Sequence, residues 1–312
     1  MNYENLYNSI QAYAENTESL FVANIPVFVQ EAEERVYNSV QIPALRKNVT
    51  GTLTAGNQYI SLPDDWLSNF SLAVIDSTNR YNYLLNKDVN YLREAYPTVV
   101  YTSPTYQGTP GGVPAYYALF GSKFSNVNEM TLMVAPTPDQ SYPVEMHYYY
   151  YPPTIVQGQI SNFGAITAGS LYTNGVYQNV ALTGGSGANA TADIVISGGV
   201  IVSCSLKFGG NFYVVGDILS CSSLGSTGSG FSIPVSSISN AAGTSWLGDN
   251  YDPVLFYGAM REAMLFMKGE ADLVGYYENK YQEAVAQLNR LGTGLERGDA
   301  YRNGQAKIVV NP

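Results

Sequence analysis

The residues of this sequence that could do chemistry are few and scattered. His147 is the single histidine, so a serine–histidine–aspartate triad or a histidine-rich metal site would depend on it alone. Its aromatic neighbours indicate a strand, which favours a half-buried structural histidine. Asp64 and Asp65 could form a carboxylate pair for acid–base catalysis. They precede Trp66 in LPDDWL, however, and are more typical of a turn that caps a short helix.

The glycine-rich stretch 225–230 (GSTGSG) and the two cysteines are further candidates for a ligand site. The stretch lacks the Lys-Ser/Thr pair of a phosphate loop, and the strand-like FSIPV follows it, so we predict a β-turn. Cys204 and Cys221 both lie in strand-like runs and could face each other. Two buried free thiols, in a protein made in a reducing cytoplasm, are the favoured interpretation.

The tyrosine run 148–151 could stack on sugars, because aromatic faces suit the apolar faces of sugar rings. Tyrosine is equally typical of buried protein interfaces, which we favour. No cluster of titratable residues emerges from the sequence. We therefore expect no enzyme, no metal site and no bound cofactor.

The composition points to a protein that is buried in an assembly. Hydrophobic residues make up 46% of the 312 residues and charged residues only 13%, while 27 residues are tyrosine. The net charge of -10 argues against a nucleic-acid-binding face and against anionic membranes. We expect neither a secretion signal nor a membrane span.

Residues 252–291 carry the strongest secondary-structure pattern in the chain. Their apolar positions recur every three or four residues, which predicts one face of a long helix. Asp252 is the expected cap, Pro253 suits the first turn and Gly292 is the expected stop. Gly269 predicts a kink or two helices that meet there. The apolar positions are Leu255, Ala259, Ala263, Phe266, Leu273, Tyr277, Tyr281, Ala284, Val285 and Leu288.

Two shorter helices are predicted near the N-terminus. The first covers residues 3–14, and the second runs over about 26–40 with Asn24 as its cap. On the second helix Glu31 and Arg35 can form an ion pair one turn apart. These two helices and the long C-terminal one can bury their apolar faces against each other as a bundle.

Short runs rich in β-branched and aromatic residues follow, from about residue 45 to 152. The stretch 48–62 predicts a hairpin with its turn at 55–57. Further strands are expected at 72–75, 115–120, 130–135 and 144–151, with a short helix between Asp88 and Tyr96. They predict a small antiparallel sheet.

Between residues 158 and 240 glycine and serine dominate, and only Asp193, Lys207 and Asp217 are charged. We interpret this segment as an all-β module inserted between the sheet and the C-terminal helix, so its two ends should lie close together. The predicted fold class is therefore α+β. The expected domains are 1–157 with helices and sheet, 158–243 as the β-module, and 244–312 with the long helix and an extended tail.

The parts outside the β-module resemble the head-to-tail adaptor (connector) proteins of short-tailed bacteriophages. The resemblance lies in the N-terminal helix followed by FVANIPVFVQEAEERVYNSV, then LPDDWL at 62–67, GVPAYYAL at 112–119, APTPDQSYPVEMHYYYYPP at 135–153 and SWLGDNYDPVLFYGAMREA at 245–263. The β-module departs from the usual adaptor pattern, in which a short linker is expected. It resembles small glycine-rich β-domains of phage tail and fibre proteins.

The resemblance implies a structural virion protein of the neck, assembled in the host cytoplasm. About twelve copies would form a ring that joins the portal to the tail nozzle or tube and conducts DNA through its lumen without specific binding. It would also provide a platform for tail fibres. The residues expected at the subunit interface are Tyr276, Tyr277 and Tyr281, and those expected in a portal-contacting tail are Lys307, Ile308, Val309 and Val310.

A carbohydrate- or receptor-binding tail protein is the alternative function, with the β-module as its binding head. The few aromatic residues of that module are a thin basis for sugar stacking, whereas the rest of the chain is rich in them. A hydrolase is disfavoured by the single histidine.

Overall fold

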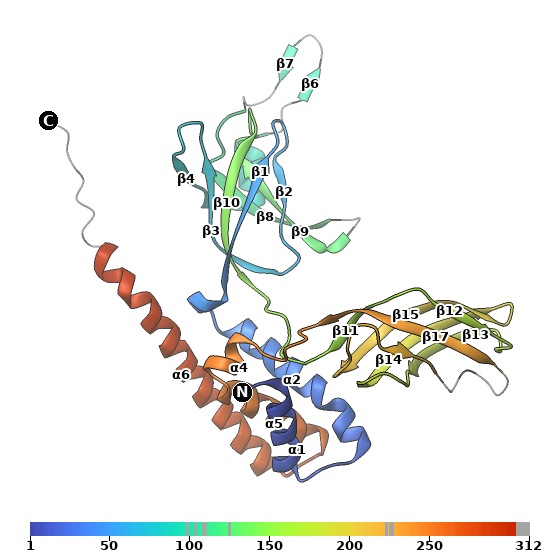
Figure 1. Ribbon diagram of the computed structural model, residues 1–312. Coiled ribbons are helices and arrows are strands. Elements are labelled where there is room, and N and C mark those ends of the chain that lie inside the picture. The colour runs from blue at the N-terminus through green and yellow to red at the C-terminus, as the bar shows by residue number, and fades with distance from the viewer. Residues whose placement is uncertain are drawn as a thin grey trace. The chain divides into compact units, whose positions relative to one another are not determined.

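The computed structural model describes residues 1–97, 100–102, 105–107, 111–123, 126–221, 224 and 228–303. The chain divides into two compact units (Figure 1). Unit 1 combines residues 1–41 with residues 153–312, and unit 2 consists of residues 42–152. Helices and antiparallel sheets are both prominent, which confirms the α+β class.

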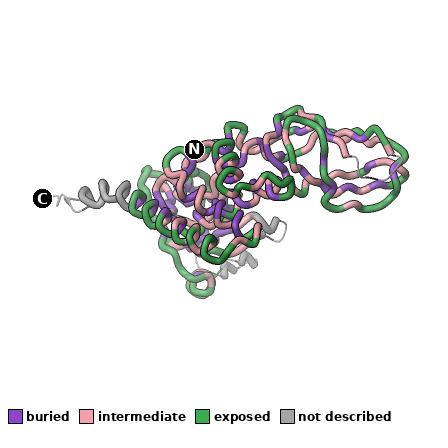
Figure 2. Tube along the Cα trace, turned by 90° about the horizontal axis from the view of Figure 1, so that it is seen from below, coloured by how far each residue is buried: buried purple, intermediate pink, exposed green. Residues whose placement is uncertain are grey.

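The helices of unit 1 pack around α5, which contacts α1, α2, α4 and α6. Buried positions recur along these helices at the spacing of one face (Figure 2). Gly258 on α5 permits a close approach, because a Cβ there would lie 2.8 Å from the Ala32 side chain on α2. The helices are α1 (Tyr3–Ala14), α2 (Ser19–Ser39), α4 (Trp246–Asn250), α5 (Pro253–Phe266) and α6 (Ala271–Asn303).

The second helix begins earlier than its sequence pattern predicted. We expected a start at Pro26 with Asn24 as cap, but α2 begins at Ser19 and contains Pro26 in its interior. Phe21 and Ile25 lie on the buried face and are at most 1% exposed. The burial of these side chains offsets the backbone hydrogen bond that proline removes.

The C-terminal helical segment consists of two helices that meet near Gly269, which confirms one of the two alternatives predicted there. Helix α5 ends at Phe266 and α6 begins at Ala271. The expected stop at Gly292 is wrong, because α6 continues to Asn303. Asp252 precedes α5 but makes no side-chain capping hydrogen bond. The apolar positions predicted for residues 252–291 are not all buried, since Leu273 is 47% exposed whereas Leu288 is fully buried.

The β-module of unit 1 consists of two sheets that share one apolar core. One sheet has the order β11-β17-β12 with β16 on β17, and the other has the order β13-β14-β15. Gly210 has a φ of +60°, and a Cβ there would lie 2.2 Å from the Ala188 carbonyl oxygen, so β15 needs glycine at this point. The strands are β11 (Gln159–Phe163), β12 (Thr167–Ser170), β13 (Gly175–Ala181), β14 (Ala188–Ser197), β15 (Val200–Asn211), β16 (Ile218–Leu219) and β17 (Ser229–Ser239).

The two ends of the β-module lie side by side, as expected for an insertion. Gln159 pairs with Ser239, and the Gly158 amide donates to the Asn240 carbonyl. The junction segment 154–156, which leads into the module, is held by Glu33 of α2. Its carboxylate accepts hydrogen bonds from the Thr154 hydroxyl at 2.6 Å and the Ile155 amide at 2.8 Å. A buried acidic side chain thus ties the start of the module to the helices.

Unit 2 is built from two four-stranded sheets that share one core. Their orders are β1-β10-β3-β4 and β2-β9-β8-β5, and β6 and β7 pair with each other. The elements are η1 (Pro43–Leu45), β1 (Arg46–Leu53), β2 (Tyr59–Ser61), β3 (Trp66–Ile75), β4 (Tyr81–Tyr83), β5 (Leu85–Asn86), α3 (Val89–Ala95), β6 (Val100–Thr102), β7 (Thr105–Gln107), β8 (Tyr116–Lys123), β9 (Asn126–Ala135) and β10 (Tyr142–Tyr150).

The hairpin predicted for residues 48–62 is wrong. Strand β1 pairs with β10 and β2 pairs with β9, so the two neighbours in sequence belong to different sheets. Local alternation cannot distinguish a hairpin from a crossing between sheets, because both need only a turn. Asp64 and Asp65 do lie in a turn, but β3 follows at Trp66 in place of the expected short helix.

Candidate interaction surfaces

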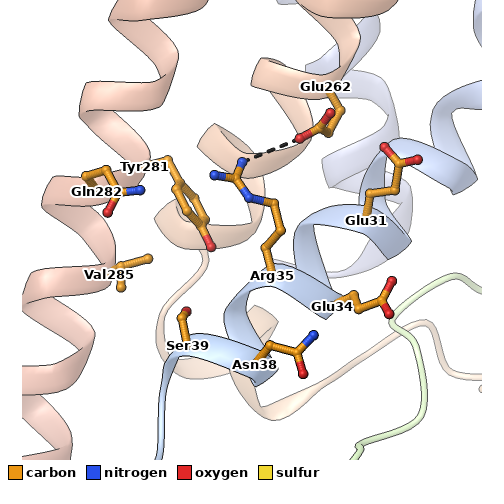
Figure 3. Close-up of a pocket in the computed structure, with 9 residues that line it drawn as sticks. All are labelled: Glu31, Glu34, Arg35, Asn38, Ser39, Glu262, Tyr281, Gln282 and Val285. Carbon is orange, nitrogen blue, oxygen red and sulfur yellow. Dashed lines mark hydrogen bonds and ion pairs between the residues drawn. The ribbon is translucent and has the colours of Figure 1, made fainter.

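An open groove of about 550 Å³ lies between α2 and α6, with α5 as its floor (Figure 3). Both outer helices pack on α5, and the groove runs along the seam that this arrangement leaves. Its lining is polar and carries three carboxylates and one guanidinium. The lining residues are Glu31, Glu34, Arg35, Asn38, Ser39, Glu262, Tyr281, Gln282 and Val285.

Arg35 organises the charges of this groove. Its guanidinium pairs with Glu262 on α5 at 3.4 Å and with both carboxylate oxygens of Glu278 on α6 at 3.1 Å. The same group lies 4.5 Å above the ring of Tyr281, a cation–π geometry. The ion pair predicted between Glu31 and Arg35 is replaced by these pairs, which join three helices. Because the partners of Arg35 are distant in sequence, the spacing of residues within α2 could not predict these ion pairs.

The pKa shifts of Glu31, which lines the groove, and of Glu278, which pairs with Arg35, have opposite directions. Partial burial raises the pKa of Glu31, and the neighbouring carboxylate of Glu262 adds to the rise, while Arg261 opposes it. Burial also acts on Glu278, but hydrogen bonds from Gln282 and Arg35 outweigh it and lower the pKa of that group. Neither histidine nor cysteine is among the described residues that line the groove.

A second surface is an aromatic patch formed by α1, α5 and α6, which comprises Tyr13, Phe256, Tyr257, Tyr276 and Tyr277. The ring of Tyr13 lies 5.0 Å from that of Phe256, and the rings of Tyr276 and Tyr277 lie 5.4 Å apart. Tyr13 is 64% exposed and Tyr276 is 52% exposed. The other three are partly buried, and an aromatic cluster of this kind is typical of protein interfaces.

The three tyrosines expected at a subunit interface occupy different environments. Tyr276 and Tyr277 belong to the aromatic patch, where partial burial near other tyrosines raises the pKa of Tyr277. Tyr281 is only 3% exposed and packs within its own chain beneath Arg35. Residues 307–310, expected to contact a portal, lie outside the described residues, as does part of the glycine-rich stretch 225–230.

His147 and Asp65, two further candidates from the sequence, belong to unit 2. His147 lies on β10, half-exposed, with Nε2 3.1 Å from Glu145, as a strand histidine should. The carboxylate of Asp65 accepts a hydrogen bond from Tyr148 and pairs with Lys47. These contacts outweigh the effect of burial and lower the pKa of Asp65.

Several tyrosines that we assigned to interfaces instead belong to the core of unit 2. Tyr148 and Tyr149 are 4% and 7% exposed. They face opposite sides of β10, so each packs against a different part of the unit. Cys204 and Cys221 are both free and partly buried, as predicted.

Within the described ranges, no group of three or more acidic, histidine or cysteine side chains is arranged to hold a metal ion. None of the helices in that part of the chain is both long and apolar enough to cross a bilayer.

Residues 1–183 match the protein family described as SU10 adaptor protein. The chain belongs to this adaptor family. No curated protein matches the chain. The match covers α1, α2, the whole of unit 2 and the first strands of the β-module through β13.

Membership of the SU10 adaptor family implies a phage structural protein of the virion neck, with portal and tail proteins as partners. It is a family of structural proteins rather than of enzymes. The groove and the aromatic patch both include α5 and α6, which follow the matched residues. The surfaces available for contacts therefore combine matched and unmatched parts of the chain.

Proposed function

We propose that this adaptor-family protein forms a closed ring that joins the portal to the tail of a short-tailed phage. The aromatic patch on the helices carries this proposal, because the chain belongs to an adaptor family and partly exposed clusters of aromatic side chains are typical of protein interfaces. A cyclic ring needs a different, complementary surface on the neighbouring subunit. The ring would comprise about twelve copies, as in the adaptors that the sequence resembles.

Tyr276 and Tyr277 are the proposed centre of the contact between neighbouring subunits. Aromatic side chains at the middle of an interface contribute most to its free energy when they become fully desolvated. Tyr281 lies on the same helix but is buried, and its ring packs against Arg35 in the same chain. The proposed role of Tyr281 is therefore to hold the shape of α6 at the interface.

The ring is tested by mutating the aromatic patch. We expect Tyr276→Ala combined with Tyr277→Ala to convert the ring to monomers in mass photometry, with and without added portal protein. The matched control is Tyr83→Ala in unit 2, since Tyr83 is 67% exposed and lies outside the patch. A double variant that still assembles like the native chain refutes the proposed interface.

The lumen of the ring would conduct DNA without holding it. The net charge of -10 supports this, because a negative surface repels phosphates. We expect no binding of double-stranded DNA by the purified protein at physiological salt in a fluorescence anisotropy titration. Binding that weakens with added salt would contradict the idea.

The C-terminal tail is proposed to contact the portal through residues 307–310 (KIVV), a β-prone run that could add a strand or a wedge there. Deleting residues 300–312 should abolish portal binding in a pull-down while the circular dichroism spectrum of the chain is preserved. Portal binding that survives the deletion refutes this role.

The β-module, residues 158–243, is proposed as a separate domain that docks tail fibres or the next tail component. Its two ends lie together, so the module can be excised and residues 157 and 244 rejoined. Fibres should then fail to attach, while ring formation persists. Attachment of fibres to rings that lack the module refutes the docking role, and binding of the full chain on a glycan array would favour the alternative function in carbohydrate recognition.

A further inference from the structure

A second cavity of about 300 Å³ opens in unit 2 between the edges of its two sheets. Strand β1 is the edge of one sheet and β2 is the edge of the other, and they do not pair. No charged side chain lines this cleft. The lining residues are Val49, Thr50, Gly51, Thr52, Ile60, Ser61, Leu62, Pro63, Leu72, Leu132, Val144 and Met146.

The inner face of β1 is uncovered at this cleft. Val49 pairs with Met146 and Gly51 pairs with Val144, and both β10 partners are at most 6% exposed. Alternation therefore places Val49 and Gly51 toward the core. Val49 is nevertheless 37% exposed, and Gly51 contributes no side chain. The core of unit 2 is open where these two positions face it.

The free edge of β1 lacks the features that normally protect an edge strand. Natural edges carry charges, proline or bulges that prevent pairing with another chain. Residues 48–52 (NVTGT) contain no charge and no proline, and the register with β10 runs without a shift. Lys47, the nearest charge, already pairs with Asp65. The outward backbone groups of residues 48–52 have no backbone partner among the described segments.

We propose that the edge of β1 accepts an extended, uncharged segment of another virion protein as an added strand, whose alternate branched apolar side chains fill the cleft. The unpaired edge selects an extended backbone, and the neutral apolar lining selects the side chains. Each described strand of this chain is already part of a sheet in the same chain, so a second copy could reach β1 only through the edge of one of those sheets, an outcome that the test below separates. That the segment comes from another virion protein rests on the proposed function, in which the adaptor contacts portal and tail proteins. The site itself does not depend on ring formation.

Gly51 allows the cleft to be closed by mutation. A Cβ at this position would meet the Val144 methyl group at 3.4 Å, and the backbone φ is not in the left-handed region, so a side chain fits. Gly51→Val places a branched side chain where the donor's side chain would lie. Thr50→Val is the matched control: Thr50 borders the cleft, but alternation turns its side chain to the face of β1 opposite Gly51.

Hydrogen exchange of the full chain, measured by mass spectrometry, tests the proposal. The probe is a short peptide of alternating threonine and valine with a lysine at each end. At saturating peptide we expect exchange in residues 46–53 to slow by about tenfold or more, because edge amides gain partners. A peptide with alternate backbone amides N-methylated should have no effect, since it cannot donate to the edge.

Gly51→Val should weaken the binding of the peptide by about tenfold and Thr50→Val by less than about twofold. If Gly51→Val proves unstable in a thermal melt, Val49→Lys tests the same cleft by placing a charge at its mouth. The proposal is overturned if the peptide leaves exchange unchanged or if a folded Gly51→Val binds it like the native chain.

Two other occupants would also overturn the proposal. If residues 46–53 are already protected from exchange in the free chain and lose that protection when the chain is truncated to residues 1–303, the occupant of the edge is the chain's own C-terminal tail. Protection that rises with the concentration of the free chain identifies a second copy. The peptide assay measures neither portal binding nor ring size, so its failure is distinguishable from failure of the adaptor proposal.

Discussion

Replacing Glu33 by glutamine should make the stability of unit 1 less dependent on pH. Glu33 is 3% exposed, and its carboxyl group accepts hydrogen bonds from the Thr154 hydroxyl and the Ile155 amide. Burial raises the pKa of Glu33 from 4.5 to about 7, against the opposing effect of those two hydrogen bonds. Glutamine has nearly the same shape and can keep both contacts, with its amide group donating to the hydroxyl of Thr154, but it cannot ionise.

The sign of the effect follows from proton linkage. Between the unfolded value near 4.5 and the folded value of about 7, the folded chain holds the proton of Glu33 more tightly than the unfolded chain does. The stabilising contribution of protonated Glu33 is therefore complete below the unfolded pKa and is lost as the pH rises through the folded pKa. From pH 5 to pH 8 this loss amounts to about 2 to 3 kcal/mol.

The assay is urea unfolding of the native chain and of Glu33→Gln, followed by far-ultraviolet circular dichroism at several pH values. Other titrating groups affect both proteins equally, so the difference between their unfolding free energies isolates Glu33. That difference should grow in favour of the variant by about 2 to 3 kcal/mol between pH 5 and pH 8. Glu33→Ala serves as the contrast, because it also cannot ionise but leaves a buried hydroxyl and amide without their acceptor, so it should be less stable than Glu33→Gln by about 1 to 3 kcal/mol at every pH.

A constant difference between native chain and Glu33→Gln across this range would refute the reasoning. It would mean that Glu33 ionises in the folded chain at its ordinary pKa, so the junction segment 154–156 does not exclude water from the carboxyl group. A difference that grows toward low pH would refute the sign as well.

Three further perturbations test the packing of the described residues. Leu288→Ala should destabilise by about 2 to 5 kcal/mol in urea unfolding because Leu288 is fully buried, whereas Leu273→Ala, at a half-exposed position, should cost less than about 1 kcal/mol; equal costs would contradict the burial pattern. Arg35→Met removes the ion pairs to Glu262 and Glu278 and should lower the free energy of unfolding by about 1 to 2 kcal/mol. The loss should be smaller in 1 M salt, which screens the ion pairs of the native chain. A loss of stability that salt does not change would assign the effect to packing alone. Burial raises the pKa of Cys204 and of Cys221 to about 11, so alkylation by iodoacetamide at pH 8 should be about 100-fold slower in the folded than in the unfolded chain, and equal rates would show that the thiols are accessible.

The regular elements that the sequence predicted well are those with a strong local pattern. The helix at residues 3–14 has the predicted bounds, and the short helix α3 begins after Asp88, whose side chain caps it. In these segments the periodic apolar face and the capping residue agree, so little depends on distant contacts. The ends of α2 and α6 were predicted less well, because their extension beyond Pro26 and Gly292 depends on what surrounds them.

The surfaces could be predicted only in part. Tyr276, Tyr277 and Tyr281 were expected on the part of the long C-terminal helix that neighbouring subunits would share; the first two lie in the aromatic patch, whereas Tyr281 is buried. The contribution of α1 to that patch through Tyr13 was not foreseeable, because residues more than 240 positions apart meet there. The ion pairs of Arg35 likewise needed three helices to be placed.

The sequence by itself determined the α+β class, the helical and strand-rich segments, the insertion of a glycine-rich β-module and the resemblance to phage adaptors. These follow from periodicity, composition and local motifs, which act over a few residues. The tertiary structure alone decided that residues 48–62 cross between two sheets, that Tyr281 is core, and that the cleft beside β1 is open. Each of these is a property of contacts between segments far apart in the chain, and the packing of buried faces against each other, not local propensity, sets which segments meet.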